Sequence, residues 1–169
     1  VLWLDADSPH GDAAIAHGQR LQTVVDGLGL HHSTQIDYYF QPVLNLDVVS
    51  TKDMIQLDGV NDVMTIEDHS DLEISASGFT IVFSFVPQKM GSEQVLLSKQ
   101  SAAGVGYSLI LTTENKVRFS LNDGSNQKYL DSLDTVQSDR PYFVVIQVNA
   151  SEMTMNLNAG PQGSIPISP

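Results

Sequence analysis

Residues 79–86, which have the sequence FTIVFSFV, decide the fold of this chain. Large apolar side chains occupy every second position from 79 to 85. An alternation with a period of two predicts a β-strand that packs one face against a core. The same pattern recurs at 107–111 and 117–121, with a polar turn between them, and this arrangement predicts a β-hairpin.

Strand patterns continue at regular intervals through the second half of the chain. Residues 94–99 and 153–157 predict further strands, and the almost continuous apolar run at 142–148 predicts a central strand covered on both faces. Strands about 8–12 residues apart, separated by polar turns, are typical of a sandwich or barrel. The first half is less regular, with strands predicted at 1–4, 54–57 and 63–66 and mostly loop at 12–25.

The two ends of the chain suggest its organisation. Residues 159–169 hold three prolines and two glycines, which predicts an extended tail or linker. The chain begins at Val1 rather than at Met, so we expect a processed product or a segment of a larger protein. Its length suits one domain, which we place at 1–158, with the tail at 159–169.

The charge balance excludes several classes of partner. Twenty acidic residues outnumber eight basic ones, for a net charge of −12. Nucleic-acid binding depends on Lys and Arg at the phosphates, so neither nucleic acid nor an anionic membrane surface is expected as a partner. The chain has no cysteine and no apolar stretch long enough to span a bilayer. Disulfides, thiol chemistry and membrane insertion are therefore not expected.

Four segments, in order along the chain, carry a family likeness. They are LWLDA at 2–6, DGLGLHHSTQ at 26–35, LDGVNDVMTI at 57–66 and SGFTI at 77–81. Together they resemble motifs of bacterial and viral laminin-G-like, concanavalin A-like jelly-roll modules, and the likeness covers residues 1 to about 157. It implies an all-β fold, a two-sheet antiparallel β-sandwich. The superfamily includes lectins, glucanases and purely structural modules, so the fold alone does not give the function.

The sequence departs from this family at two places. Val24 stands where the family often has a Trp. The strand that usually ends these domains has no match after Leu157. This predicts that the chain is truncated, or that another segment or a neighbouring subunit completes the sandwich, because an uncovered edge strand invites association.

Catalytic patterns are missing from the sequence. Glucanases of this superfamily carry paired carboxylates at an E-x-D-x-x-E spacing, and the nearest acidic clusters here, 67–68 and 71–73, do not match it. No Ser-His-Asp signature or phosphate-binding glycine loop is present. We therefore expect a protein that is not an enzyme, with glycoside hydrolysis as the third-ranked function.

Two groups of residues suggest metal binding. His31 and His32, with Asp26, have transition-metal ligand types, but adjacent strand residues face opposite ways, which favours polar loop histidines instead. Oxygen ligands for Ca²⁺ are offered by Asp58, Asn61 and Asp62. The alternative for this loop is a tight turn closed by its own side chains. Further oxygen-rich segments lie at 5–7 and 122–126.

Aromatic residues beside polar ones suggest glycan binding, because a sugar packs its C–H face on a ring while its hydroxyls form hydrogen bonds. Tyr129 lies close in sequence to Asn122, Asp123 and Asn126. A second candidate is the pair Tyr38 and Tyr39, for which packing at an edge or interface is the alternative.

These observations favour a non-catalytic recognition or adhesion module that binds a glycan or surface polysaccharide. The setting we expect is an extracellular, cell-surface or virion protein. The alternative is a structural or assembly module that decorates a particle or spaces other domains. The missing final strand and the Pro/Gly segment favour that alternative.

Overall fold

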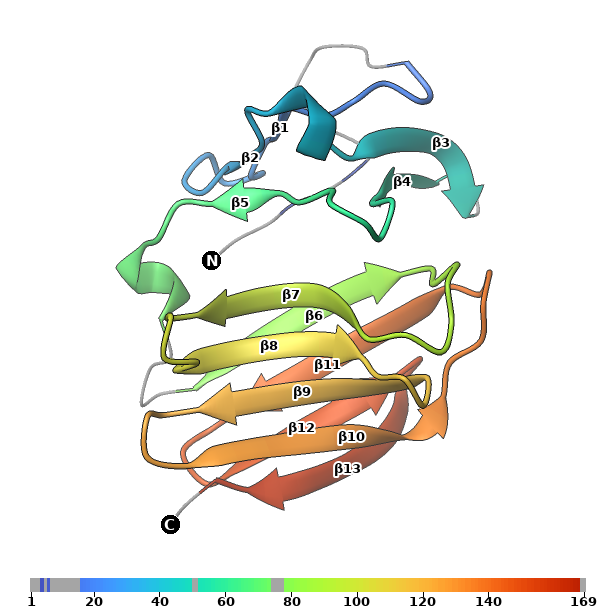
Figure 1. Ribbon diagram of the computed structural model, residues 1–169. Helices are drawn as coiled ribbons and strands as arrows, with labels where there is room; N and C mark the ends of the chain where they lie inside the picture. Colours follow the sequence, from blue (N-terminus) through green and yellow to red (C-terminus); the bar gives the residue numbers. More distant parts are fainter. Residues whose placement is uncertain (1–3, 5, 7–15, 50–51, 74–77, 168–169) are drawn as a thin grey trace. The chain divides into compact units, whose positions relative to one another are not determined.

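The computed structural model describes Leu4, Ala6 and residues 16–49, 52–73 and 78–167 (Figure 1). The described chain is all-β with four antiparallel sheets, and its only helices are two short 3₁₀ turns. None of the helices in these ranges is long and apolar enough to cross a membrane. Contacts divide the chain into unit 1, Val1–Glu73, and unit 2, Ile74–Pro169, whereas the sequence predicts one domain over 1–158.

Unit 2 consists of two four-stranded antiparallel sheets, an arrangement consistent with a β-sandwich. The first sheet has the order β10 (Gln127–Thr135), β9 (Lys116–Asn122), β8 (Gly106–Leu111) and β7 (Gln94–Gln100). The second has the order β13 (Gly160–Pro166), β12 (Glu152–Leu157), β11 (Tyr142–Val148) and β6 (Phe79–Phe85). Figure 1 shows the two sheets as separate layers of unit 2.

The alternation predicted for β6 is confirmed. The side chains at 79, 81, 83 and 85 pack against the core of unit 2, whereas Thr80, Val82 and Ser84 face outward. Both sheets contribute to that core, with Phe119 and Leu109 from one and Ile146 and Met153 from the other fully buried. Burial of each such side chain stabilises the fold by about 1.5–3 kcal/mol. The predicted hairpin is also confirmed: β8 pairs with β9 from Gly106 to Leu111.

The prediction for residues 142–148 is wrong in one respect. They form β11, which is a central strand between β12 and β6. However, only one face is buried, by Val144, Ile146 and Val148, whereas Phe143 on the other face is 48% exposed. A continuous apolar run arose here because apolar residues also occupy the outward face of the sheet.

The prediction of an extended tail is wrong for residues 160–166. They form β13, which pairs with β12 and gives this sheet an edge strand from the same chain. Prolines fit there because an edge strand leaves some N–H groups without ladder partners. At the register shift Met155 pairs with Gly163 and Asn156 with Pro161, so Gln162 is the extra residue, next to Gly163, whose φ is +133°. Gln162, only 3% exposed, joins the two layers through hydrogen bonds to Asp134 of β10.

Unit 1 has shorter elements and a smaller core. Its core consists of the fully buried Leu21, Val24 and Leu44, with Ile55 and Met64 packed against it. The strands are β1 (Thr23–Val24), β2 (Ser33–Thr34) and β5 (Thr65–Ile66) in one sheet and β3 (Val43–Val49) with β4 (Lys52–Gln56) in the other; the 3₁₀ turns are η1 (Tyr38–Phe40) and η2 (Ser70–Leu72).

The sequence predictions for unit 1 are partly confirmed. The strand predicted at 54–57 corresponds to β4, which begins two residues earlier and ends one residue earlier, and the strand predicted at 63–66 corresponds to β5, which begins two residues later. Residues 16–22 contain no helix, as expected. In the predicted strand at 1–4, only Leu4 is described, and it forms an isolated bridge with Asp26. The acidic residues at 5 and 7 lie outside the described residues.

Candidate functional site

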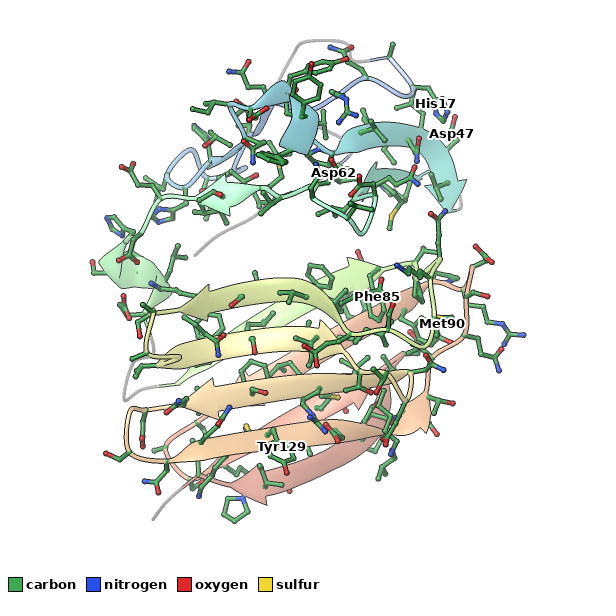
Figure 2. The ribbon with its side chains drawn as sticks, in the orientation of Figure 1. His17, Asp47, Asp62, Phe85, Met90 and Tyr129 are labelled. Carbon is green, nitrogen blue, oxygen red and sulfur yellow. The ribbon has the colours of Figure 1, made fainter. Side chains whose placement is uncertain are left out.

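Tyr129 is the best-supported of the predicted ligand-binding residues. On β10, Leu130 points into the core, so its neighbours Tyr129 and Asp131 face outward. Tyr129 is 57% exposed, and Figure 2 labels it on this strand. The guanidinium carbon of Arg118 lies 4.6 Å from the centre of the tyrosine ring. An aromatic ring thus stands on the surface of the sheet with a cation against one face.

Arg118 is held in place by a two-pronged ion pair. Its Nε and Nη2 atoms donate hydrogen bonds to the two carboxylate oxygens of Asp131, at 2.6 Å and 2.7 Å. These bonds hold the pKa of Asp131 below its ordinary value and raise the pKa of Arg118. A planar, bidentate pair fixes the guanidinium orientation and, through it, limits the movement of the Tyr129 ring. We call Tyr129, Arg118 and Asp131 the Tyr129 platform.

A row of hydroxyl side chains lies beside the platform on the same face of the sheet. Strand register places Ser120 opposite Tyr129, then Ser108 opposite Ser120, and then Ser98 opposite Ser108. Serine side chains are short, so the surface next to the ring is low. Ser108 and Ser120 are only 8% and 9% exposed, so the exposed hydroxyl of this row is that of Ser98, which can donate and accept hydrogen bonds.

The predicted polar partners of Tyr129 lie in the turn between β9 and β10. Asn122 shares the outward face with Ser120, but its Oδ1 accepts a hydrogen bond from the N–H of Gly124. The Oδ1 atom of Asp123 accepts from the N–H groups of Asn126 and Ser125, and these bonds lower the pKa of Asp123. These carboxylate and amide oxygens therefore shape the turn first, and only Asn122 is placed on the face that carries the ring.

Tyr38 and Tyr39 lie in η1 of unit 1, so they belong to a different unit from Tyr129. They are 63% and 74% exposed, and their ring centres are 5.9 Å apart in an edge-to-face arrangement. The guanidinium carbon of Arg20 lies 5.0 Å from the centre of the Tyr38 ring. Arg20 also donates to the carbonyl of Gln41. This second aromatic surface resembles the Tyr129 platform in having an arginine support.

The residues predicted to bind calcium close a turn on themselves. Asp58 Oδ1 accepts hydrogen bonds from the backbone N–H groups of Val60, Asn61 and Asp62, which lower the pKa of Asp58. In return, Asp62 Oδ2 accepts from the N–H of Asp58. The Asp62 side chain is 6% exposed, and its Oδ1 lies 3.7 Å from Arg20 (Figure 2). These contacts match the turn alternative, and calcium binding here stays a prediction.

The structure does not bring together the side chains of Asp26, His31 and His32, which the sequence suggested as transition-metal ligands. Asp26 is buried and accepts hydrogen bonds from the N–H groups of Leu28, Leu30 and His31, while His32 Nδ1 accepts from the N–H of Asp26. The three residues thus shape a loop and do not converge through their side chains, as the opposite-facing argument indicated.

His31 instead lies close to His69 and Asp71, which the sequence did not suggest as metal ligands. Its Nε2 lies 3.4 Å from Asp71 Oδ2, and His69 Nδ1 lies 3.5 Å from the same oxygen. Potential ligand atoms of all three side chains lie within 4.8 Å of one another. The His-x-Asp pattern at 69–71 was the available signal, but its pairing with His31 depends on the register between β2 and β5.

One further surface feature lies on the other sheet of unit 2. A shallow hollow of about 370 Å³ is lined by Thr80, Gln147, Glu152 and Thr154, among others. It offers hydroxyl, amide and carboxylate groups. The ring of its one aromatic residue, Phe79, packs against the core. It therefore lacks the exposed ring that distinguishes the Tyr129 platform.

Comparison with known proteins assigns the chain to no family. No protein-family model matches the chain, and no curated protein has a significantly similar sequence. The functional argument therefore rests on the residues of the Tyr129 platform and their surroundings.

Proposed function

We propose that the chain is a non-catalytic recognition module that binds carbohydrate at the Tyr129 platform. The observation that carries the proposal is an exposed tyrosine ring supported by a bidentate Arg118–Asp131 pair. A pyranose would stack its C–H face on the open side of the ring, and its hydroxyls would bond to neighbouring polar groups. Because the ring is already held in place, little side-chain freedom would be lost on binding.

The surroundings of the ring suggest which groups would meet the sugar. Asn122 supplies a carboxamide from the end of β9. Ser98 supplies an exposed hydroxyl at the far end of the serine row, whereas Ser120 and Ser108 are almost fully buried. A single ring on an open sheet surface buries little area. We therefore expect a dissociation constant in the millimolar range for one sugar site, about −4 kcal/mol. Useful affinity would require several copies or a repeating polysaccharide.

Fold resemblance and setting complete the proposal. The four motifs resemble those of concanavalin A-like modules, whose superfamily includes lectins, although only the motif at 77–81 lies in unit 2. We propose an extracellular, cell-surface or virion location on the same resemblance. A net charge of −12 supports a neutral glycan over an acidic one, because an acidic polysaccharide would be repelled.

The test is a glycan array probed with a multivalent form of the full chain, followed by NMR titration of the best sugar. Tyr129→Ala should abolish binding, and Tyr129→Phe should retain most of it because the ring remains. Tyr38→Ala and Gln147→Ala are matched controls on the second aromatic surface and the hollow, and both should bind as the parent does. If a control variant lost binding while Tyr129→Ala still bound, the carbohydrate site would lie at the control position and not at the Tyr129 platform. The absence of any array signal would refute the proposal.

A structural or assembly role is the second candidate, and a specific surface favours it. Val82 and Phe143 are 58% and 48% exposed on the outward face of the second sheet, and Val145 lies opposite Val82 in the register. An apolar patch of this kind fits a protein partner. Light scattering on the full chain and on a Val82→Thr/Phe143→Ser variant tests this role. An oligomer that the variant dissociates would favour assembly, whereas one monomeric mass for both would count against it.

Glycoside hydrolysis is the third candidate and carries the least support. The sequence lacks the paired-carboxylate spacing of the superfamily's glucanases. Release of reducing sugars from a β-glucan by the full chain would establish it over the binding proposal.

A further inference from the structure

We propose that His31, His69 and Asp71 form a binding site for a divalent transition metal, with Zn²⁺ as the best-fitting ion. The proposal concerns unit 1 and is independent of the carbohydrate site. Imidazole nitrogens and a carboxylate oxygen are the donors that zinc accepts in sites with three protein ligands and one open position.

Strand register explains why residues so far apart in the sequence meet here. β2 pairs with β5 in an antiparallel arrangement, with Ser33 opposite Ile66 and Thr34 opposite Thr65. Continuing that register two residues beyond Ser33 brings His31 level with the chain just before His69. The 3₁₀ turn η2 (Ser70–Leu72) then turns the chain so that Asp71 faces the same point.

Two of the three distances between ligand atoms are those of a tetrahedral site. The His31 Nε2 and His69 Nδ1 atoms lie 3.4 Å and 3.5 Å from Asp71 Oδ2. Bonds of about 2.0–2.2 Å at tetrahedral angles separate neighbouring ligand atoms by about 3.3–3.6 Å. The two measured edges therefore fit a zinc ion. The two rings lie at a tilt of 52°, with centres 4.7 Å apart, and their ligand nitrogens lie within 4.8 Å of each other. The two histidines would have to close on the ion to complete the third edge.

A second observation points to a ligand at this position. The His31 side chain is 5% exposed, yet its Nε2 has no hydrogen-bond partner. An unsatisfied buried polar atom is costly, and native proteins usually avoid it. The backbone of His31 is anchored by its N–H bond to Asp26, so this nitrogen is held in place and aimed at Asp71. A metal ion would satisfy it.

His69 has a competing contact that metal binding would replace. The N–H of Asp71 donates to His69 Nδ1 at 3.2 Å, near the long end of the hydrogen-bond range. The side chains of His69 and Asp71 are 52% and 48% exposed, so an ion can reach them from solvent. In the proposed site the buried His31 is the fixed ligand, and the other two residues close on the ion.

Zinc titration of the untagged full chain, monitored by competition with a chromogenic chelator, tests the proposal. We expect one zinc ion per chain, and Co²⁺ should give the visible absorption of a tetrahedral site. His69→Gln and Asp71→Asn change half-exposed side chains and should leave the fold intact, as circular dichroism can verify. Each should weaken zinc binding by about ten-fold or more, since even loss of an outer-shell partner does so at characterised sites.

His17→Ala is the matched control, because His17 lies outside the cluster and accepts a hydrogen bond from the N–H of Leu46. It should bind zinc as the parent chain does. Folded parent protein that takes up no zinc at micromolar concentrations would overturn the proposal. Binding that survives both His69→Gln and Asp71→Asn would do the same, because it would show an adventitious site elsewhere.

Discussion

At the scale of single residues, arginine supports an exposed tyrosine ring in each unit of this chain. In unit 2 the support is rigid, because the guanidinium and the carboxylate make two short hydrogen bonds. In unit 1 the nearest carboxylate oxygen is 3.7 Å away and buried, and the arginine donates to a backbone carbonyl instead. The difference is one reason for placing the carbohydrate site in unit 2. The supported ring is that of Tyr129 in unit 2, with Arg118 and Asp131, and that of Tyr38 in unit 1, with Arg20 and Asp62.

The Arg118–Asp131 pair gives a pH-dependent prediction. Hydrogen bonding to Arg118 lowers the pKa of Asp131 in the folded state. The pair therefore stabilises the fold above the unfolded-state pKa of about 3.9, and this contribution is lost as the pH falls through the lower, folded-state pKa. For a pair that is about one-third exposed, we expect Asp131→Asn to cost about 0.5–1 kcal/mol at neutral pH.

Urea unfolding of the parent and of Asp131→Asn at pH 7 and near pH 3 measures this difference. The gap between the two proteins should shrink at the acid end. Glu93→Gln removes the same charge from an exposed position and should show little effect at either pH. A gap that is equally large at both pH values would contradict the assignment of the stabilisation to the ionised carboxylate.

At the scale of elements, β8 depends on a glycine at its first residue. Gly106 has φ of +135°, and a Cβ added there would collide with the carbonyl oxygen of Lys99 in the neighbouring strand. Gly106→Ala should therefore destabilise unit 2 by about 1–3 kcal/mol, since it adds a backbone clash to the cost of the left-handed region. Gly91→Ala is the control, because Gly91 has φ of +74° but open space around it.

Thermal unfolding of the two variants separates the clash from the backbone strain. Gly91→Ala should lose only the strain of a positive φ, about 1 kcal/mol. Equal losses for both variants would show that the strand partner of Gly106 can move aside.

The edge strand β13 gives a second prediction at this scale. Removal of residues 159–169 would expose the ladder groups of β12 and the space filled by Ile165 and Gln162. An open β edge pairs readily with other chains. Light scattering should therefore show larger species for the shortened chain than for the full chain. A shortened chain of unchanged mass with its strand content intact would show that β12 tolerates an open edge.

At the scale of the whole molecule, the two units have separate cores of very different size. Among the described residues, unit 1 buries three apolar residues fully or almost fully, and unit 2 buries thirteen. Stability scales with buried apolar area, so unit 1 should open first. The proposed metal site lies within unit 1, and bound zinc would tie the loop before β2 to η2. Metal binding would thus stabilise the weaker unit.

Native-state hydrogen exchange in increasing urea tests this order of opening. Amides of β2 and β5 should lose protection at lower urea than amides of β9 and β11. Zinc should narrow the difference by protecting unit 1 alone. A single common transition for all these strands would show that the two units unfold as one cooperative body.

The sequence by itself determined strands β6 to β9, β11 and β12 of unit 2 and the turn between β9 and β10. These features depend on local chemistry: a period-two pattern selects which face of a strand is buried, and Asn and Asp side chains bond to backbone groups two or three residues away. The same local chemistry accounts for the outward position of Tyr129, once the structure shows that residues 127–135 form β10 with Leu130 in the core. It also explains the turn at Asp58.

Only the tertiary structure decided the features that require two distant segments to meet. Residues 160–166 have the composition of a linker, and they form β13 because β12 offers an edge where proline is tolerated. The Arg118 guanidinium lies against the Tyr129 ring because β9 pairs with β10 in the register that sets Arg118 opposite Asp131. His31 meets His69 and Asp71 because β2 pairs with β5. Register is set by non-local pairing, and a linear pattern does not contain it.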